Sequence, residues 1–529
     1  MTDAPLPQTL LQQEKRIIWL ATGLLLAAML LKLGVQPLFL EEPRRIMIAL
    51  ELVENGNLWV PTELGDFYYK KPPVFNWLLL ASAWVCGKYS EFAFRLPTVL
   101  STLSMAFLIF WLGRRYVGAR FGAYSALLFV TGGGILMYFS TLAEIDLFYS
   151  LITFAGFASF FHFYQNNKYW PAFLLTYALG AIGTLTKGPP SVLFLGLTIF
   201  AWLAWKRDLK RLFSMAHLAG GILYLAILGG YLYIYSQYNS LDNYFAGLWG
   251  QSSEMTILEK SFGQLLRHLV NFPLDTLKDL LPGGLLLVFT FRRDFWKVIR
   301  QNDLLVFALI TFAVNFPVYW LSPGARQRYI YMLYPLLLYI FVYFQQEKDA
   351  RAWMHRFLRI SLYIIMGALT LAPLAINFVP DLAFLSWRRP LSMVFTVVMG
   401  GIFFYALRKP ALQLPLLILS MIVCRLLFDL TVLPQRAVES GALREKQLAA
   451  EILKYTGKDE LYMYGEGRIS FTSTVYIGLM RGQTLRRKRN IESGNCYLAE
   501  TRLLEGRDDY KTLLEFEYNG LPHALVRID

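Results

Sequence analysis

The strongest constraint on this chain is a series of long apolar runs that repeats from Ile17 to the region of Pro434. Each run is about 17–25 residues long, which matches the thickness of a bilayer for a helix. Only 17% of the residues are charged, whereas soluble domains carry about 25%. The sequence therefore predicts a mainly α protein, a polytopic membrane helical bundle of about thirteen spans. The predicted spans lie near 17–36, 96–112, 121–139, 147–165, 169–186, 188–205, 212–235, 273–291, 304–322, 329–344, 359–379, 391–407 and 411–432.

Basic clusters between the runs predict which way each loop faces. With a cytoplasmic N-terminus, alternation of the spans places the clusters at 114–120, 206–211, 292–300, 348–359 and 408–409 on one side. The positive-inside rule makes that side the cytoplasm. These clusters form no basic stripe, so the formal charge of +14 does not indicate nucleic-acid binding.

The apolar runs end near residue 433, which predicts two domains. We expect a membrane domain at 1–433, with a long outer first loop at 37–95, and a soluble extracytoplasmic domain at 434–529. The tail pattern predicts a small α/β unit. Its expected elements are a helix at Arg444–Tyr455 and strands near Glu460–Tyr464, Cys496–Thr501 and Ala524–Ile528. The basic run 486–489 reads as a solvated face, with contact to headgroups or substrate as the alternative.

The first outer loop carries two polar motifs. Glu41 and Glu42 open a predicted helix and are followed by Arg44, so they are either a helix cap or part of an active site. Further on, Tyr69 and Lys71 lie next to a Pro-Pro turn and an aromatic stretch. Lysine in this setting suits a lipid phosphate, and the alternative is an interfacial anchor, because Lys and Tyr side chains commonly extend to the interface.

Three further outer corners carry charge. They hold Glu144 with Asp146, then Lys187, and then the 326–329 corner with Arg326, Arg328 and Tyr329. Acidic side chains at the mouth of a span are costly unless they face water or a cation. Because the predicted topology puts all these groups on one outer face, we expect acids that act on a hydroxyl and cations that hold phosphate.

These motifs resemble the bacterial relatives of the protein O-mannosyltransferases, close to the lipid A aminoarabinose transferase group, which have a C-type glycosyltransferase fold. The resemblance rests on Glu41-Glu42-Pro43-Arg44, Tyr69-Lys70-Lys71-Pro72-Pro73, Glu144-Ile145-Asp146, Leu185-Thr186-Lys187-Gly188-Pro189, and Arg328-Tyr329 with Pro335. It covers about the first 345 residues in the same order and implies a bacterial inner-membrane location.

The resemblance implies roles for individual residues. Glu41 stands where the family usually has a catalytic aspartate, and Arg44 and Lys71 correspond to residues that bind the donor phosphate. Family members often place a glutamate before Lys-Pro-Pro that helps bind a divalent metal, but this chain has Lys70 there. A metal ion is therefore left open, with Glu144 and His268 as its candidate ligands.

The function expected from these observations is an inverting transfer of a sugar from a polyprenyl-phosphate donor. The acceptor would be a lipid A-like glycolipid, a glycan or a protein outside the cytoplasm. Glu41 or Asp146, with Glu42 beside them, are the candidate catalytic carboxylates. Two alternatives stay open: a lipid-linked sugar flippase or transporter, and a non-catalytic envelope scaffold. Transporters tend to show repeated halves, which this sequence lacks.

Overall fold

The computed structural model describes residues 8–253, 262–347, 350–457 and 459–528. Part of the segment between the predicted spans 212–235 and 273–291 and part of the basic cluster 348–359 lie outside these residues. The chain divides into two compact units. Unit 1 comprises 1–33, 98–230 and 249–433, and unit 2 comprises 34–97, 231–248 and 434–529.

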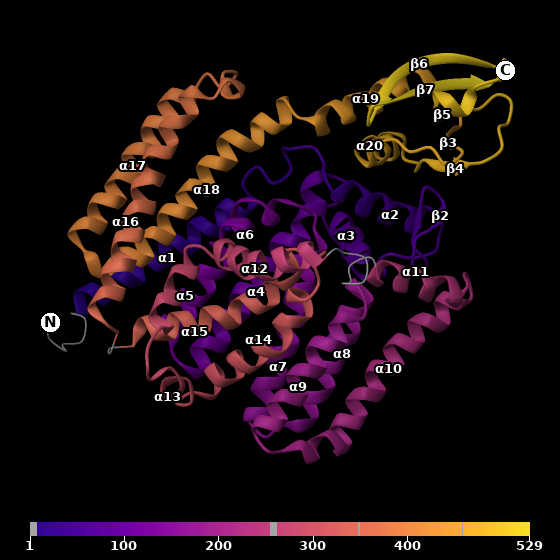
Figure 1. Ribbon diagram of the computed structural model, residues 1–529. Helices are drawn as coiled ribbons and strands as arrows, with labels where there is room; N and C mark the ends of the chain where they lie inside the picture. Colours follow the sequence, from indigo (N-terminus) through magenta and orange to yellow (C-terminus); the bar gives the residue numbers. More distant parts are fainter. Residues whose placement is uncertain (1–7, 254–261, 348–349, 458, 529) are drawn as a thin grey trace. The chain divides into compact units, whose positions relative to one another are not determined.

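Unit 1 is built from helices (Figure 1). Its α-helices, three of which begin or end in unit 2, are α1 (Gln8–Leu30), α4 (Glu91–Tyr116), α5 (Ala119–Val130), α6 (Gly133–Met137), α7 (Ile145–Gln165), α8 (Tyr169–Lys187), α9 (Pro190–Trp205), α10 (Met215–Ser236), α12 (Phe262–Asp279), α13 (Phe295–Ile299), α14 (Asp303–Trp320), α15 (Tyr334–Gln346), α16 (Ala352–Ala375), α17 (Arg388–Arg408) and α18 (Gln413–Val438). Short 3-10 helices join them, among them η1 (Phe139–Thr141), η2 (Leu209–Phe213), η4 (Gly283–Thr290) and η5 (Gln327–Leu333).

The chain is a multi-pass membrane protein by the length and hydropathy of its helices. Over the described ranges, 7 helices are long and apolar enough to cross a membrane, and a bent pair would make 8. The predicted count of about thirteen is therefore not confirmed. Part of the difference is length, since α9 has 16 residues and α15 has 13.

Two predicted spans differ from the structure in shape. The run at 121–139 was expected to be one helix, but it breaks at Thr131 and Gly132 and bends by 56°. The run at 273–291 is also not one helix, because α12 ends at Asp279 and the apolar part forms η4 after Pro282. Glycine at 132–134 accompanies the first break, and Pro282 with the glycines after it accompanies the second.

The core of unit 1 is aromatic. Trp202 of α9 is fully buried, and its ring lies 5.8 Å from Phe161 of α7 and 5.2 Å from Phe307 of α14. Small residues allow α4 and α5 to approach closely, because a Cβ atom on Gly122 would lie 2.5 Å from the Phe110 carbonyl oxygen. Close packing at glycine is typical of membrane helix contacts.

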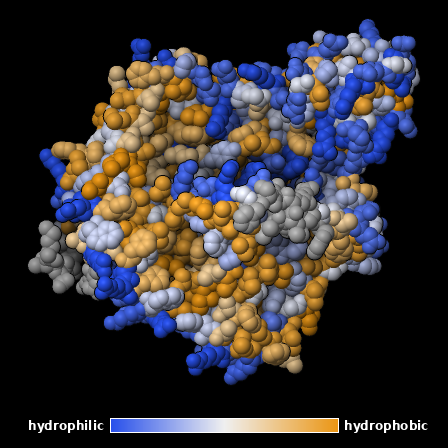
Figure 2. All heavy atoms as spheres, viewed as in Figure 1, coloured by the Kyte–Doolittle hydropathy of each residue, from blue (hydrophilic) through white to orange (hydrophobic). Residues whose placement is uncertain are grey.

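Unit 2 combines the first loop with the C-terminal tail. Its elements are α2 (Glu42–Glu54), β1 (Thr62–Glu63), β2 (Asp66–Phe67), α3 (Val74–Val85), α11 (Leu241–Ser253), α19 (Gly441–Thr456), β3 (Leu461–Tyr464), α20 (Phe471–Arg481), β4 (Arg486–Lys488), β5 (Cys496–Glu500), η9 (Thr501–Leu504), β6 (Tyr510–Tyr518) and β7 (Leu521–Ile528). The tail sheet has the order β4-β3-β5-β7-β6, with β3 parallel to β4 and β5 and the remaining pairs antiparallel. Figure 2 shows hydrophilic side chains over much of this tail and hydrophobic ones over the helices of unit 1.

The predicted tail elements are confirmed at α19, β3, β5 and β7, whereas α20, β4 and β6 were not predicted. The basic run at 486–489 contributes β4. Within it, the side chain of Arg487 is 6% exposed and its Nε atom lies 2.9 Å from the Asp66 carboxylate. The Arg487 backbone N–H donates to the Leu64 carbonyl at 2.8 Å. This strand therefore holds the tail against the first loop.

Candidate functional site

The acidic segment of unit 1 lies at the start of α7. Glu144 is the extended residue before the helix, and Asp146 is in its first turn. Both side chains are buried, at 0% and 2% exposure. The hydroxyl of Thr98 donates to the Glu144 carbonyl at 3.3 Å and accepts from the Glu144 N–H at 3.2 Å. This segment is thus fixed by α4 and not left as a mobile loop.

Two predicted cations meet this segment. Lys187, the last residue of α8, contacts Asp146 Oδ1 through its Nζ atom. Arg328 of η5 lies with Nε 3.2 Å from Asp146 Oδ2 and with an Nη atom 3.5 Å from Glu144 Oε1. The cluster thus contains two carboxylates and two cations, so its charges balance without bulk water. The structure brings together Glu144, Asp146, Lys187 and Arg328, and their roles in the chemistry stay predictions.

Aromatic rings surround the lysine. Lys187 Nζ lies 4.1 Å from the centre of the Tyr329 ring and 5.0 Å from the Tyr149 ring, which is cation–π geometry. Gly188 ends α8 with φ 102°, so the chain turns away immediately after the lysine. Burial lowers the pKa of Arg328, but Asp146 and Glu144 outweigh burial and raise it, so the guanidinium stays charged.

An arginine that sequence reasoning missed supports the same segment. Arg425 of α18 is 1% exposed and pairs with Asp429 at 2.6 Å. It also donates to the Ser140 hydroxyl at 2.9 Å and to the Leu136 carbonyl, in the broken stretch before Glu144. Charged residues four apart inside an apolar run were the available signal, because such residues are rare in spans and usually paired.

The first-loop acids of unit 2 have different surroundings. Glu41 precedes α2 and pairs with Arg44; their side chains are 38% and 22% exposed. The Arg44 guanidinium lies 5.5 Å from the Phe471 ring of α20. Glu42 is fully buried, and its two oxygens accept from Arg95 at 2.8 Å and 3.0 Å. The contacts give Glu42 a structural role, and its catalytic role stays a prediction.

The lysine motif leads into α3. Pro73 is the residue before the first turn of that helix, and it fixes the backbone after the two lysines. Lys71 is half-buried and Lys70 is exposed. The Tyr69 hydroxyl accepts a hydrogen bond from Asn239 at 3.2 Å. The two neighbouring lysines therefore differ in burial, which makes them a matched pair for testing.

A glutamate in α2 clamps the first-loop hairpin and was not predicted. Glu51 is 1% exposed and accepts from the Leu64 N–H at 2.7 Å, the Gly65 N–H at 3.1 Å and the Thr62 hydroxyl at 2.5 Å. Leu64 and Gly65 form the turn with φ 58° and 82°. Burial raises the pKa of Glu51 to about 7, against the lowering effect of these hydrogen bonds.

The predicted metal ligands do not form a metal site. Over the described ranges, no three His, Cys, Asp or Glu residues are arranged to hold a metal ion. Glu144 faces Arg328, and His268 Nε2 lies 3.2 Å from the Tyr319 carbonyl oxygen. Arg326, which was predicted as a cation of the outer face and not as a metal ligand, precedes η5 and is exposed. Within the part of the chain that the structure describes, the surroundings of Glu144 and His268 therefore do not fit a divalent cation.

Comparison with known proteins gives consistent results. Residues 70–234 match the family described as dolichyl-phosphate-mannose-protein mannosyltransferase. The undecaprenyl phosphate-alpha-4-amino-4-deoxy-L-arabinose arabinosyl transferase of Edwardsiella ictaluri is 31% identical over 185 residues, which cover 34% of this chain and 33% of that protein. The protein of the same name from Erwinia tasmaniensis gives the same identity and coverage. The matches thus span about a third of the length of these curated relatives.

The likeness to a solved structure is longer. The crystal structure of ArnT from Cupriavidus metallidurans bound to undecaprenyl phosphate has a TM-score of 0.72 and 17% identity, covering 96% of this chain and 97% of that one. At this identity the likeness shows the fold. The chain therefore has the ArnT-like C-type glycosyltransferase fold, and the resemblance of its motifs to mannosyltransferases and aminoarabinose transferases is confirmed.

Proposed function

We propose that the protein is a membrane glycosyltransferase that moves a sugar from a polyprenyl-phosphate donor to an extracytoplasmic acceptor with inversion. The acceptor is a lipid A-like glycolipid, a glycan or a protein. The observation that carries the proposal is the buried cluster in which Lys187 and Arg328 flank Asp146 at the ends of membrane helices. The match to a mannosyltransferase family over 70–234, which contains Asp146 and Lys187, supports it.

The proposed reaction is a single displacement. The acceptor oxygen bonds to the anomeric carbon while the bond from that carbon to the phosphate oxygen breaks. The acceptor proton passes to a carboxylate, and the polyprenyl phosphate leaves with the electron pair. Preorganised cations stabilise the charge that develops on the leaving phosphate. We assign that role to five residues, Arg44, Lys71, Lys187, Arg326 and Arg328, with Tyr69 and Tyr329 as aromatic contacts.

Either Glu41 or Asp146 accepts the proton. A general base must come within hydrogen-bond reach of the acceptor hydroxyl. The side chain of Glu41 is 38% exposed, whereas that of Asp146 is 2% exposed and has a cation at each oxygen. These contacts favour Glu41 as the base and Asp146 as the group that orients Lys187 and Arg328.

The proposed arrangement in the membrane follows the positive-inside rule. The N-terminus is cytoplasmic, and the first loop at 37–95 and the tail at 434–529 lie outside, in the bacterial periplasm. This arrangement is tested with single cysteines at exposed positions in the first loop and tail, labelled in intact cells with a membrane-impermeant maleimide. Labelling of the two regions from opposite sides would contradict the shared compartment.

The activity is tested by giving the purified full-length protein several polyprenyl-phosphate sugars and acceptors, and identifying the product by mass spectrometry. Lys71→Met is expected to lower turnover by about 100-fold or more, the effect of removing one charge-stabilising donor. The matched control is Lys70→Met, which removes the exposed neighbouring lysine and is expected to leave turnover unchanged. Equal turnover of the two variants would remove Lys71 from the mechanism.

A further inference from the structure

Unit 1 has another set of basic residues, far from Asp146 and Lys187. They lie near the C-terminal end of α7 and the N-terminal end of α8. They line a pocket of about 380 Å³ that includes Lys168, Tyr169, Trp170, Arg211 and Met215. Because α7 has 21 residues, this pocket lies about 30 Å from the Asp146 cluster. The proposed reaction makes no use of these residues.

The guanidinium of Arg211 is held in place within this pocket. It lies 3.6 Å from the centre of the Tyr169 ring, and its Nε atom is 3.1 Å from Asp208 Oδ2. The two residues that contact Arg211 are themselves held by hydrogen bonds. The Tyr164 hydroxyl donates to Asp208 at 3.1 Å, and the Tyr169 hydroxyl donates to Asn167 at 2.8 Å. Since the ion pair is made through Nε, the terminal N–H groups can donate to an anionic ligand.

The electrostatic balance of this region is positive. Lys168 borders the pocket and is exposed. The connection from α9 to α10 adds Arg207 and Lys210 to Arg211, with Asp208 as the one carboxylate of that stretch. A fixed guanidinium beside a flexible ammonium is a suitable recognition site for phosphate.

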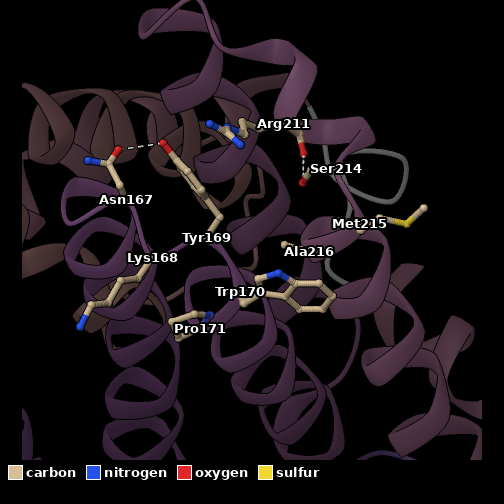
Figure 3. A pocket seen from close by; sticks show the side chains of 9 residues that line it. All are labelled: Asn167, Lys168, Tyr169, Trp170, Pro171, Arg211, Ser214, Met215 and Ala216. Atoms are coloured by element: carbon tan, nitrogen blue, oxygen red, sulfur yellow. Dashed lines mark hydrogen bonds between the residues drawn. The ribbon is translucent and has the colours of Figure 1, made fainter.

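The pocket also has an apolar border. Trp170 is 54% exposed, Met215 is 73% exposed, and the neighbouring Phe213 is 83% exposed. Figure 3 shows the Arg211 side chain near the Tyr169 ring, with Trp170 of α8 and Met215 of α10 bordering the same pocket. Exposed large side chains at the ends of membrane helices suit contact with acyl chains. A free phosphate would make no use of them, so the combination favours a lipid.

We propose that this pocket binds the headgroup of an anionic glycerophospholipid. Arg211 and Lys168 hold the phosphate, and the acyl chains lie against Trp170 and Met215. Basic pockets between membrane helices on the cytoplasmic side are suited to anionic headgroups. The predicted topology puts the pocket on that side, whereas the sugar-transfer chemistry belongs to the other. The inference therefore does not depend on the proposed enzyme activity.

The test is a lipid titration of the full-length protein, followed by native mass spectrometry. Phosphatidylglycerol is expected to bind at least about tenfold more tightly than phosphatidylcholine, and Arg211→Gln is expected to weaken phosphatidylglycerol binding by about tenfold. The matched control is Arg408→Gln, which removes one exposed cation from α17, outside the pocket and outside the α9–α10 connection. Equal binding of the two lipids, or equal weakening by both variants, would overturn the site.

Two further arms keep the result interpretable. Lys168→Gln changes an exposed side chain, and it is expected to weaken phosphatidylglycerol binding several-fold even if Arg211→Gln fails to fold. Unchanged binding in Lys168→Gln would remove the ammonium from the site and overturn the proposal. Inorganic phosphate at millimolar concentration is expected not to displace phosphatidylglycerol. Displacement would show a site for soluble anions and overturn the assignment to a lipid.

Discussion

Replacing Arg425 with methionine should destabilise the protein strongly. The arginine is 1% exposed and its partner Asp429 is fully buried, so the change leaves an uncompensated carboxylate inside unit 1. It also removes the donor to the Ser140 hydroxyl and the Leu136 carbonyl. Breaking a buried pair from one side costs about 3–5 kcal/mol of unfolding free energy.

The double variant Arg425→Met/Asp429→Leu separates the pair from the packing. It removes both charges and fills the space with apolar atoms, so it should recover most of the unfolding free energy lost in the single variant. Denaturant unfolding of the purified protein in detergent measures all the variants. Arg408→Met on α17, which replaces an exposed arginine, is the control and should change the unfolding free energy by less than about 0.5 kcal/mol. A single variant no less stable than this control, or a double variant no better than the single one, would refute the reasoning.

Three other predictions concern the site and unit 2. Lys187→Met should lower turnover by about 100-fold, measured by product mass spectrometry, and wild-type turnover would exclude its role at the phosphate. Because the folded-state pKa of Glu51 is raised from 4.5 to about 7, its stabilising contribution is complete below pH 4.5 and is lost as the pH rises through 7. The change is about 3 kcal/mol and should disappear in Glu51→Gln; equal pH dependence of the unfolding free energy in both proteins would contradict it. Tyr476→Phe removes the hydroxyl that accepts from Leu38 N–H at 2.9 Å and donates to Glu91 at 2.8 Å. The unfolding free energy, measured by thermal unfolding, should fall by about 1–3 kcal/mol. An unchanged melting temperature would contradict a stabilising role for these two hydrogen bonds.

The sequence alone predicted the features that depend on local pattern. Hydropathy is a property of neighbouring residues, so the spans that became α4, α7, α14, α16 and α17 were predicted near their observed positions. The tail strands β3, β5 and β7 were predicted from the same local pattern, whereas β4 and β6 were not. The motif residues Asp146 and Lys187 were identified because they are charged residues at the ends of apolar runs. Their direct contact was not part of that prediction.

The tertiary structure decided which charges meet. Asp146 and Lys187 are 41 residues apart in sequence, and only the packing of α7 against α8 sets their contact. Arg95 and Glu51 were missed because their partners come from distant parts of the chain or from backbone groups of a turn. The Arg425–Asp429 pair is local, but the contact of Arg425 with Ser140, 285 residues away, is not readable from sequence. Whether a buried charge stabilises or destabilises the folded state depends on its partner. Pairing between distant segments is set by the fold and not by the local sequence.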